Sequence, residues 1–421
     1  MPVERGVGPD ACDDDVMILS LCHHLMTARV FTTPTATEQG LGVVALIDAL
    51  RDEMKHRVDM EPRRWTGGLR RVLGALAVRG SNSIEGYDAT LSDVVAAADG
   101  DAPLEADEAT RQAVRGYQDA MSYVLQSTHD PTASIDEGLL KSLHFMMLKH
   151  DLSKSPGLWR PGDVFVRRED TREIVYQGPP PDLVPDLIAA MLEELEGSDT
   201  PALIRAAMAH LNLVMIHPYS DGNGRMARCL QTLVIAREQI VSPVFSSIEE
   251  YLGRNTGAYY AILGEVGKGE WHPESDARPW VRFCLTAHYR QAQSVLRRVT
   301  AFEKMWSVAA ELAHDRRLPE RCVGPICEAA YGVRVRRATY RSNVETTYGE
   351  PIPDQTASRD LRALVTAGLF VPIGDTRGRF YVPSDDLTAA WHAVRSQRPP
   401  RGTDDPFDLV RRGIQTELDL G

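Results

Sequence analysis

Lysine, cysteine and long apolar runs are all scarce in this chain of 421 residues. No stretch comes near the run of about 18 apolar residues that a transmembrane helix needs, which excludes a membrane bundle. Residues 1–15 mix proline, glycine and acidic side chains, where a secretory signal would have a basic flank followed by an apolar run. We therefore expect a cytoplasmic protein without membrane contact.

The few cysteines are also badly spaced for a metal site or a disulfide framework. No paired Cys-x-x-Cys motifs occur among Cys12, Cys22, Cys229, Cys284, Cys322 and Cys327. Reduced, mostly buried thiols are the favoured interpretation. The 47 basic residues include only 6 lysines and are outnumbered by 59 acidic ones, which gives a net charge of −12. This balance disfavours a chain whose whole surface binds nucleic acid.

The length predicts two or three domains, at roughly 150 residues per domain, that fold without disulfides or metals. Helical spacing of apolar residues predicts a mainly α fold, with helices at Leu139–Leu148, Leu183–Leu195, Leu203–Ile216 and Met226–Ile240. We expect a helical N-terminal region at 1–80, a helical domain at 81–300, a further domain at 301–395 and a loosely ordered tail at 396–421.

One short β-hairpin is predicted inside the helical domain. Val164–Val166 and Ile174–Tyr176 are apolar runs joined by a polar turn. A hairpin must lean on other elements, which leaves one edge free to pair with an extended peptide. A hairpin without such a role fits the pattern equally well.

The C-terminal domain is predicted to be a winged helix-turn-helix. A helix at Thr356–Ala367 is followed by strands at Phe370–Ile373 and Phe380–Val382, with a glycine-bounded turn between them. Residues 321–381 hold nine arginines and six acidic residues, a local charge of +3.

Such a domain could present Ser358, Arg359 and Arg362 to the major groove of DNA and Arg377 to a phosphate. Contact with another protein, or arginines that only solvate a small domain, are the alternatives.

The most informative stretch is residues 217–228, which read HPYSDGNGRMAR. A helical apolar face precedes it, and Pro218 ends that helix because a residue before proline disfavours helical dihedral angles. A second apolar helical face begins at Met226. The loop 218–224 is therefore predicted to lie between two packed helices, with His217 at a helix end.

The residues of this loop predict an anion site. Gly222 and Gly224 permit backbone conformations that let successive N–H groups converge before a helix N-terminus, where the helix dipole also favours an anion. Arg225 and Arg228 add two guanidinium groups one turn apart, and Asn223 can donate a hydrogen bond. The chain has no Gly-x4-Gly-Lys-Ser/Thr phosphate loop, so any nucleotide site belongs here.

Two further side chains predict chemistry at this anion site. Asp221 would repel a phosphate unless a cation lay between them, which implies Mg²⁺ shared with phosphate oxygens. His217, with an ordinary pKa of about 6.5, can accept a hydroxyl proton near neutral pH. A simple capped turn would explain Asp221 and the glycines, but not His217 and the two arginines.

Residues 217–228 closely resemble the signature of the Fic family, His-x-Phe-x-Asp/Glu-Gly-Asn-Gly-Arg-x-x-Arg. Every position matches except Tyr219, whose ring replaces phenylalanine and adds a hydroxyl that needs a partner. The resemblance extends to Gly157–Arg160, to the hairpin, which is similar to the family's target-docking flap, and to Tyr259 and Tyr260, similar to an aromatic pair beside adenine. It covers about residues 81–297.

The resemblance implies a Fic-type helical core that transfers AMP from ATP to a Ser, Thr or Tyr hydroxyl of a target protein. The target would dock on the hairpin near Val164–Tyr176. His217 would deprotonate the hydroxyl, Asp221 would hold Mg²⁺, and residues 222–224 would stabilise charge on the transferring group.

The same resemblance implies the contacts of the remaining ATP groups. Arg225 and Arg228 would grip the β- and γ-phosphates, and Tyr259 would lie beside the adenine. The stretch Ala261–Lys268 lacks the asparagine that contacts the base in the family, which leaves the base preference open.

A second resemblance concerns residues 81–86, SNSIEG, which fit the family's inhibitory pattern Ser/Thr-x-x-x-Glu-Gly/Asn. Taken alone, the stretch equally predicts the end of a helix followed by Gly86. Together with the signature, it predicts that Glu85 pairs with Arg228 and removes the partner of the γ-phosphate. We then expect an autoinhibited enzyme whose self-AMPylation rises when Glu85 is replaced by glycine.

Other functions stay open from sequence alone. One is a DNA-binding regulator that senses a nucleotide without catalysis. Another is a Fic relative that transfers UMP, phosphate or phosphocholine, or that removes AMP from a target. A homodimer is compatible with the sequence.

Overall fold

The computed structural model describes residues 29–59, 64–101, 105–130, 132–168, 171–197, 199–237, 242–375, 378–398 and 402–413. Over these residues the chain is mainly helical with two small antiparallel hairpins, as predicted. Cys12 and Cys22 lie outside the described residues, whereas the other four cysteines are buried and unpaired, which confirms the prediction for those four. None of the helices described is both long enough and apolar enough to cross a membrane.

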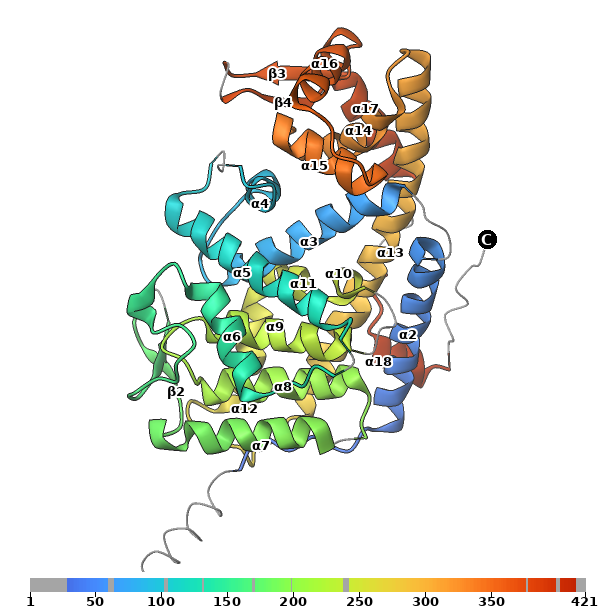
Figure 1. Ribbon diagram of the computed structural model, residues 1–421. Coiled ribbons are helices and arrows are strands. Elements are labelled where there is room, and N and C mark those ends of the chain that lie inside the picture. The colour runs from blue at the N-terminus through green and yellow to red at the C-terminus, as the bar shows by residue number, and fades with distance from the viewer. Residues whose placement is uncertain are drawn as a thin grey trace, which may run out of the picture.

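Two buried helices, α8 (Ala202–Ile216) and α9 (Asn223–Ala236), pack against each other at the centre of the fold. Every residue of α8 is buried except Arg205 and Val214, and every residue of α9 is buried except Gly224. Helix α8 is apolar on almost all sides because other helices surround it. In Figure 1, α7 lies along the outer side of α8.

Helices α3, α5, α6, α7 and α10 pack on this pair, and the other helices up to residue 267 lie outside them. Their bounds are α2 (Glu38–Asp59), α3 (Trp65–Ile84), α4 (Leu91–Ala98), α5 (Glu108–Ser127), α6 (Glu137–Leu148), α7 (Val184–Gly197), α10 (Pro243–Ser246), α11 (Glu249–Arg254) and α12 (Thr256–Gly267). The predicted helices of the central domain correspond to α6, α7, α8 and α9. Side chains of Thr90, Asp107 and Asp136 cap the N-termini of α4, α5 and α6.

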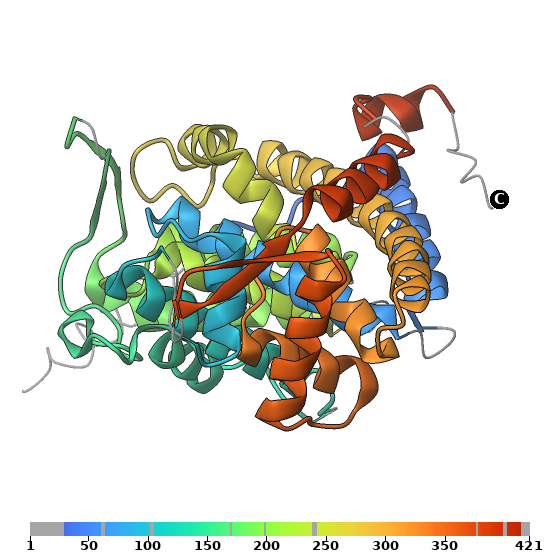
Figure 2. The same ribbon diagram turned by 90° about the horizontal axis from the view of Figure 1, so that it is seen from above.

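The hairpin predicted in the central domain is present. Strand β1 (Phe165–Arg167) pairs with β2 (Ile174–Gln177), and Val166 lies opposite Tyr176. The Tyr176 hydroxyl donates to the Met215 carbonyl at 2.7 Å, which attaches the hairpin to α8. The rest of the hairpin projects from one edge of the molecule (Figure 2).

One long helix joins this core to the C-terminal elements. Helix α13 (Arg278–Asp315) is continuous over 38 residues and therefore runs through the domain boundary predicted at residue 300. Figure 1 shows it extending from the core to the C-terminal helices, with α2 packed along it. The two predicted domains thus share a structural element.

The C-terminal elements follow the order predicted for a winged helix. They are α14 (Val323–Ala330), α15 (Arg337–Tyr348), α16 (Asp354–Thr366), β3 (Phe370–Ile373), β4 (Phe380–Pro383) and α17 (Asp385–Ser396). The hairpin β3–β4 has the predicted strands, and Val335 pairs with Tyr381 of β4 through two backbone hydrogen bonds of 2.9 and 2.8 Å. Membership of the winged-helix fold stays a prediction.

The tail predicted to be loosely ordered contains one more helix, α18 (Pro406–Arg411). Asp405 caps it, Pro406 occupies its first position, and Phe407 and Leu409 are buried against α2. The prediction was wrong for these residues because two apolar side chains find a partner helix that is distant in the chain.

Candidate active site

Residues 217–222 connect α8 to α9, and we call them the motif loop. His217 ends α8 in a left-handed conformation with φ of 52°, and Gly222 precedes α9 with φ of 78°. Glycine adopts such a φ at little cost, so Gly222 allows the sharp entry into α9. Helix α9 already begins at Asn223, so its N-terminal N–H groups lie within the predicted anion loop.

Asn223 holds the motif loop in shape. Its Oδ1 accepts the Tyr219 N–H at 2.9 Å, and its Nδ2 donates to the Tyr219 carbonyl, also at 2.9 Å. The residue is 2% exposed, so water does not compete for these bonds. The side chain predicted to bind an anion therefore also fixes the loop, a role that the sequence did not indicate.

His217 is held in one tautomer. Its Nδ1 lies 3.1 Å from the Val214 carbonyl oxygen and must donate to it, which leaves Nε2 as an acceptor. Arg160 donates from Nε to the His217 carbonyl at 2.8 Å. Burial lowers the pKa of His217, and the positive charge of Arg160 lowers it further, against the opposing effect of the bond to Val214. The imidazole is thus a neutral base near pH 7.

His144, on α6, supports the loop from the other side. The Gly157 N–H donates to His144 Nδ1 at 2.8 Å, so Nε2 carries the proton and donates to the Asp221 carbonyl at 2.9 Å. Burial lowers the pKa of His144 to about 4. Sequence reasoning missed this residue, because one histidine in a helix carries no signal of a partner 77 residues away.

Tyr219, the one departure from the signature, packs in an aromatic cluster. Its ring stacks on His144 with centroids 3.6 Å apart and lies 4.9 Å from the ring of Trp159. The packing expected of phenylalanine is therefore kept. The added hydroxyl is buried and has no hydrogen-bond partner among the described residues.

Arg225 and Arg228 are each 1% exposed yet keep unused donors. Within the described residues, Nε and Nη1 of Arg225 and Nη1 of Arg228 have no hydrogen-bond partner. Unused donors on a buried guanidinium group are costly, so this arrangement is suited to receive an anion. Beside them the α9 N-terminus adds its own positive field.

The turn that follows α3 (residues 84–87, the α3 turn) reaches these arginines. Glu85 Oε1 accepts from Arg228 Nη2 at 2.7 Å, and Ser81 on the same helix accepts from Arg228 Nε at 2.8 Å. The Tyr87 ring lies 5.2 Å from the guanidinium carbon of Arg225. Gly86 has φ of 79°, so the predicted helix-ending glycine is present as well.

The α3 turn fits closely against α9. A side-chain carbon at Gly224 would overlap the Glu85 carboxylate, which would then have to shift from this position. Tyr260 donates from its hydroxyl to the Ile84 carbonyl at 3.1 Å, which ties the end of α3 to α12.

Tyr259 and Tyr260 lie in different environments. Tyr259 is 1% exposed, and its hydroxyl lies 3.0 Å from Nε2 of buried His210. Burial lowers the pKa of His210 to about 3, so this pair forms a neutral buried contact. Tyr260 is 50% exposed, and its ring centroid lies 5.4 Å from that of Tyr259. Of the two, Tyr260 offers ring surface to a ligand.

Asp221 is the carboxylate of the motif loop. It accepts the Gly222 N–H at 2.7 Å and lies 3.4 Å from Lys154 Nζ, with its side chain 33% exposed. The described residues contain no group of three or more His, Cys, Asp or Glu side chains that could enclose a metal ion. Mg²⁺ commonly uses one or two carboxylates together with substrate phosphates, so one accessible aspartate beside an anion site fits that ion.

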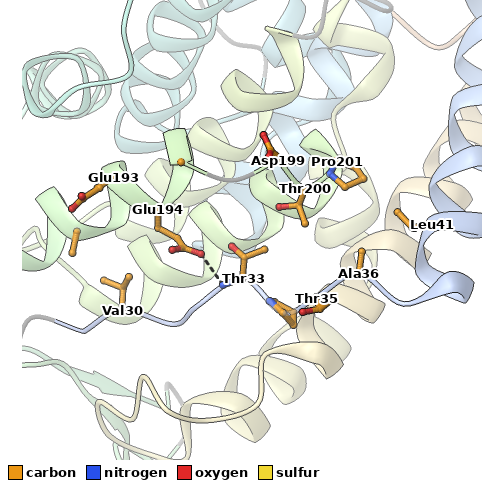
Figure 3. A pocket seen from close by; sticks show the side chains of 13 residues that line it. Val30, Thr33, Thr35, Ala36, Leu41, Glu193, Glu194, Asp199, Thr200 and Pro201 are labelled. Carbon is orange, nitrogen blue, oxygen red and sulfur yellow. Dashed lines mark hydrogen bonds between the residues drawn. The ribbon is translucent and has the colours of Figure 1, made fainter.

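A separate surface pocket lies between segment 30–36 and α7 (Figure 3). Glu193, Glu194 and Thr33 line it, and the Thr33 N–H donates to Glu194 at 2.9 Å. None of residues 217–228 lines this pocket. It is therefore distinct from the site around the motif loop.

Comparison with known proteins agrees with this geometry. Residues 134–235 match the Fic/DOC family model, and they form a domain of the Fic/DOC family. The protein adenylyltransferase Fic of Nematostella vectensis is 28% identical over 253 residues, which are 57% of this chain and 53% of the relative. The protein adenylyltransferase fic-1 of Caenorhabditis briggsae is 37% identical over 106 residues, 24% of this chain and 18% of the relative.

The chain thus spans about half the length of the first of these relatives and less of the second. Among solved structures, a Fic family protein from Desulfovibrio desulfuricans aligns with a TM-score of 0.52 at 22% identity, covering 84% of this chain and 98% of that one. This likeness extends the shared fold well beyond residues 134–235.

Proposed function

We propose that this protein is an Mg²⁺-dependent adenylyltransferase that transfers AMP from ATP to a Ser, Thr or Tyr hydroxyl of a target protein. The observation that carries the proposal is the pair of buried arginines with unused donors on α9, together with a histidine at the start of the motif loop whose Nε2 is left as a proton acceptor. The relatives named as adenylyltransferases support the same reaction.

In the proposed step, the hydroxyl oxygen of the target attacks the α-phosphorus of ATP. The new oxygen–phosphorus bond forms as the bond from that phosphorus to the β-phosphate oxygen breaks, and pyrophosphate leaves. His217 Nε2 takes the hydroxyl proton, and its neutral state near pH 7 suits it to this task. The N–H groups at the start of α9 face the charge that develops on the transferring phosphate.

The phosphate tail would be held by the two arginines. Arg225 and Arg228 supply the donors that lack partners, and charge-assisted bonds to phosphate are among the stronger hydrogen bonds. Asp221 would hold Mg²⁺, which would neutralise phosphate charge when bound. We assign the adenine to the side of Tyr260, whose ring is exposed, with Tyr259 supporting that ring from the interior.

We also propose that the enzyme is autoinhibited by Glu85. The carboxylate engages Arg228 Nη2, a donor that the γ-phosphate would otherwise use. A charge-assisted bond of this kind contributes roughly 1.5–3 kcal/mol, so its removal is expected to strengthen ATP binding by about 10- to 100-fold.

The target protein would dock on the hairpin β1–β2. Phe165 and Ile174 are 41% and 45% exposed there, and in the described part of the chain β1 pairs with β2 alone. An extended peptide could therefore add to the free edge of β1 and bring its hydroxyl toward His217.

The decisive experiment compares the wild-type chain, Glu85→Gly and Glu85→Gly/His217→Ala for self-modification by ATP labelled on the α-phosphate. We expect strong labelling of Glu85→Gly, weak labelling of the wild type and none of the double variant. Binding of ATP to the double variant should persist. Parallel reactions with labelled UTP, with ATP labelled on the γ-phosphate and with a phosphocholine donor distinguish the other transfers. Labelling by γ-phosphate alone, or equal labelling with and without His217, would overturn the proposal.

A further inference from the structure

An arginine-lined cleft lies at the surface of the C-terminal elements, between the N-terminal end of α15 and the first half of α16. Arg337, Arg359 and Arg362 line it together with Ser358, and Asp354 is its acidic member. Asp354 is already engaged by Arg341 at 2.7 Å and by Arg337 at 3.4 Å. The cleft therefore carries positive charge in a chain of net charge −12.

The chemistry of this cleft suits the phosphodiester backbone of duplex DNA. Arg359 and Arg362 are exposed, and the carboxylate nearest to Arg359 is Asp360 at 3.9 Å. Guanidinium groups fit phosphate geometry, and the N-terminus of α16 beside them favours an anion. The hairpin β3–β4 packs next to α16, where a second contact with a duplex could form (Figure 1).

The opposite side of α15 packs on α3, the helix that ends just before Glu85. A side-chain carbon at Gly67 of α3 would lie 3.1 Å from the Thr346 carbonyl oxygen of α15, so the two helices approach closely there. Arg71 of α3 bonds Glu328 of α14 at 2.8 Å and Asp99 at 2.9 Å, and it also contacts Ser342 of α15. The first half of α3 is thus fixed to the C-terminal elements.

The other end of the same helix leads to Glu85. Helix α3 is unbroken from Trp65 to Ile84, so Gly67 and Glu85 are roughly 27 Å apart at 1.5 Å per residue. Between these ends, Gly80 of α3 lies in close backbone contact with Gly253 of α11. Helix α3 therefore connects its contact with α15 to the active site, with α11 packed against it between the two.

The α3–α15 contact is also imperfectly satisfied. Asn343 of α15 is fully buried near Glu328 of α14, but the polar atoms of its side chain make no hydrogen bond of good geometry to the described residues. Glu328 is buried as well, and burial raises the pKa of its carboxyl group, opposed by Arg71. Separating the two helices would let these unsatisfied polar groups bond water. The separation therefore costs less free energy than it would for an apolar contact.

We propose that duplex DNA bound in the arginine cleft relieves the inhibition by Glu85 through helix α3. The regulation rests on the adenylyltransferase activity proposed above, whereas the DNA contact does not. Because coupling between two binding sites is reciprocal, loss of the Glu85–Arg228 contact must in turn strengthen DNA binding.

The first experiment measures binding of a fluorescent mixed-sequence DNA duplex to the full chain over a range of salt concentrations. Arg359→Ala and Arg362→Ala should each weaken binding and lower the slope of log affinity against log salt by about 1. Arg395→Ala, an exposed arginine of α17 outside the cleft, is the matched control and should behave as the wild type. Equal binding by all four chains would overturn the DNA site. So would binding of poly-glutamate but not of DNA, because the occupant would then be an acidic peptide.

The second experiment tests, in the absence of DNA, whether a change in α3 at its contact with α15 alters AMP incorporation. Gly67→Ala creates a tight contact of 3.1 Å with Thr346, which must give way by a few tenths of an ångström, whereas Gly74→Ala on the same helix meets only Val244 at 3.6 Å, an ordinary contact. Both changes favour the helical state by about 1 kcal/mol, so the two variants differ mainly in the steric contact with Thr346. We expect AMP incorporation to rise about threefold or more in Gly67→Ala and to stay unchanged in Gly74→Ala. Equal rates would overturn the coupling.

The third experiment tests whether DNA binding in the arginine cleft is coupled to the inhibition by Glu85. The duplex should raise AMP incorporation by the wild type but not by Glu85→Gly, and Glu85→Gly should bind the duplex about threefold or more tightly than the wild type. This affinity does not depend on catalysis. If Glu85→Gly shows no AMP transfer, the proposed function fails. If it transfers AMP but binds DNA as the wild type does, the coupling alone fails.

Discussion

The motif loop and the α3 turn meet at Arg228, but they are held in different ways. The loop is fixed by the Asn223 side chain, by His144 and by Arg160, all of which bond its backbone from buried positions. The α3 turn is attached through a few side chains, and a side-chain carbon added at Gly86 would meet nothing within 4 Å. Under the proposed function, the catalytic groups would therefore already be positioned, and the proposed inhibition would act by occupying an anion site.

This comparison separates two kinds of variant. Changes to the supports of the motif loop should lower turnover whether or not Glu85 is present. Changes to the attachments of the α3 turn should raise activity, and only while Glu85 is present. The variants below are ordered by the size of effect that we expect.

The largest effect should come from Asn223→Ala in the Glu85→Gly background. The loop would lose both bonds to Tyr219, and misplacement of reacting groups by about 1 Å can cost roughly 100-fold in rate. We expect a fall of that size in AMP incorporation at saturating ATP. Asn255→Ala, which removes a bond to the Tyr251 carbonyl outside the site, is the control. A change below about threefold would show that the loop holds its shape without this clamp.

A smaller loss is expected for His144→Phe, again with Glu85→Gly. Phenylalanine keeps the stacking on Tyr219 but cannot bond Gly157 or the Asp221 carbonyl. Removing such a support from a group that would hold a metal typically costs about 10-fold or more. The rate and its Mg²⁺ dependence should both change. His129→Phe, at an exposed position, should leave them as they are. Unaltered Mg²⁺ dependence would mean that His144 does not position Asp221.

Tyr260→Phe should have a modest effect in the opposite direction. It removes the hydroxyl that bonds the Ile84 carbonyl and keeps the ring. A hydrogen bond contributes about 1 kcal/mol, so AMP incorporation by the otherwise wild-type chain should rise about fivefold. Tyr123→Phe, at a side chain 44% exposed, is the control. The rise should vanish in the Glu85→Gly background. An equal rise there would place the effect on ATP binding and not on the α3 turn.

The smallest effect concerns pH. His217 acts as a base only when neutral, and burial lowers its pKa below the ordinary value of about 6.5. The rate of Glu85→Gly should therefore change less than about twofold between pH 8 and pH 6.5 and fall at lower pH, where the imidazole gains a proton. Circular dichroism at each pH controls for unfolding. A rate that is already halved above pH 6.5 would contradict the lowered pKa.

Much of this organisation follows from local sequence. Apolar spacing predicts α6 to α9, and Pro218 with Gly222 predicts the connection between the two central helices. The pattern of residues 217–228 predicts the residue types of the site, because the signature is contiguous and specific. Residues 81–86 predict the helix end and the glycine after it. All of these features depend on neighbours within a few positions.

Other features depend on contacts that the chain makes over long distances. Glu85 and Arg228 are 143 residues apart, and the bond between them exists because α3 passes over the start of α9. The support from His144, the burial of Tyr259 beside an exposed Tyr260, and the helix α18 in the predicted tail arise in the same way. Helix α13 likewise crosses residue 300, where a change in the sequence pattern predicted a boundary.

The amino-acid sequence by itself determined which chemical groups this protein carries and which of them lie at helix ends, because these depend on residue type and local backbone preference. Only the tertiary structure decided which groups meet. Packing brings distant side chains within hydrogen-bond distance and buries some of them, and burial in turn sets their protonation. That is why the two arginines were predictable as a pair, and the Glu85 carboxylate by resemblance, while the tyrosine hydroxyl that bonds Ile84 and the packing of α3 became visible only in the folded chain.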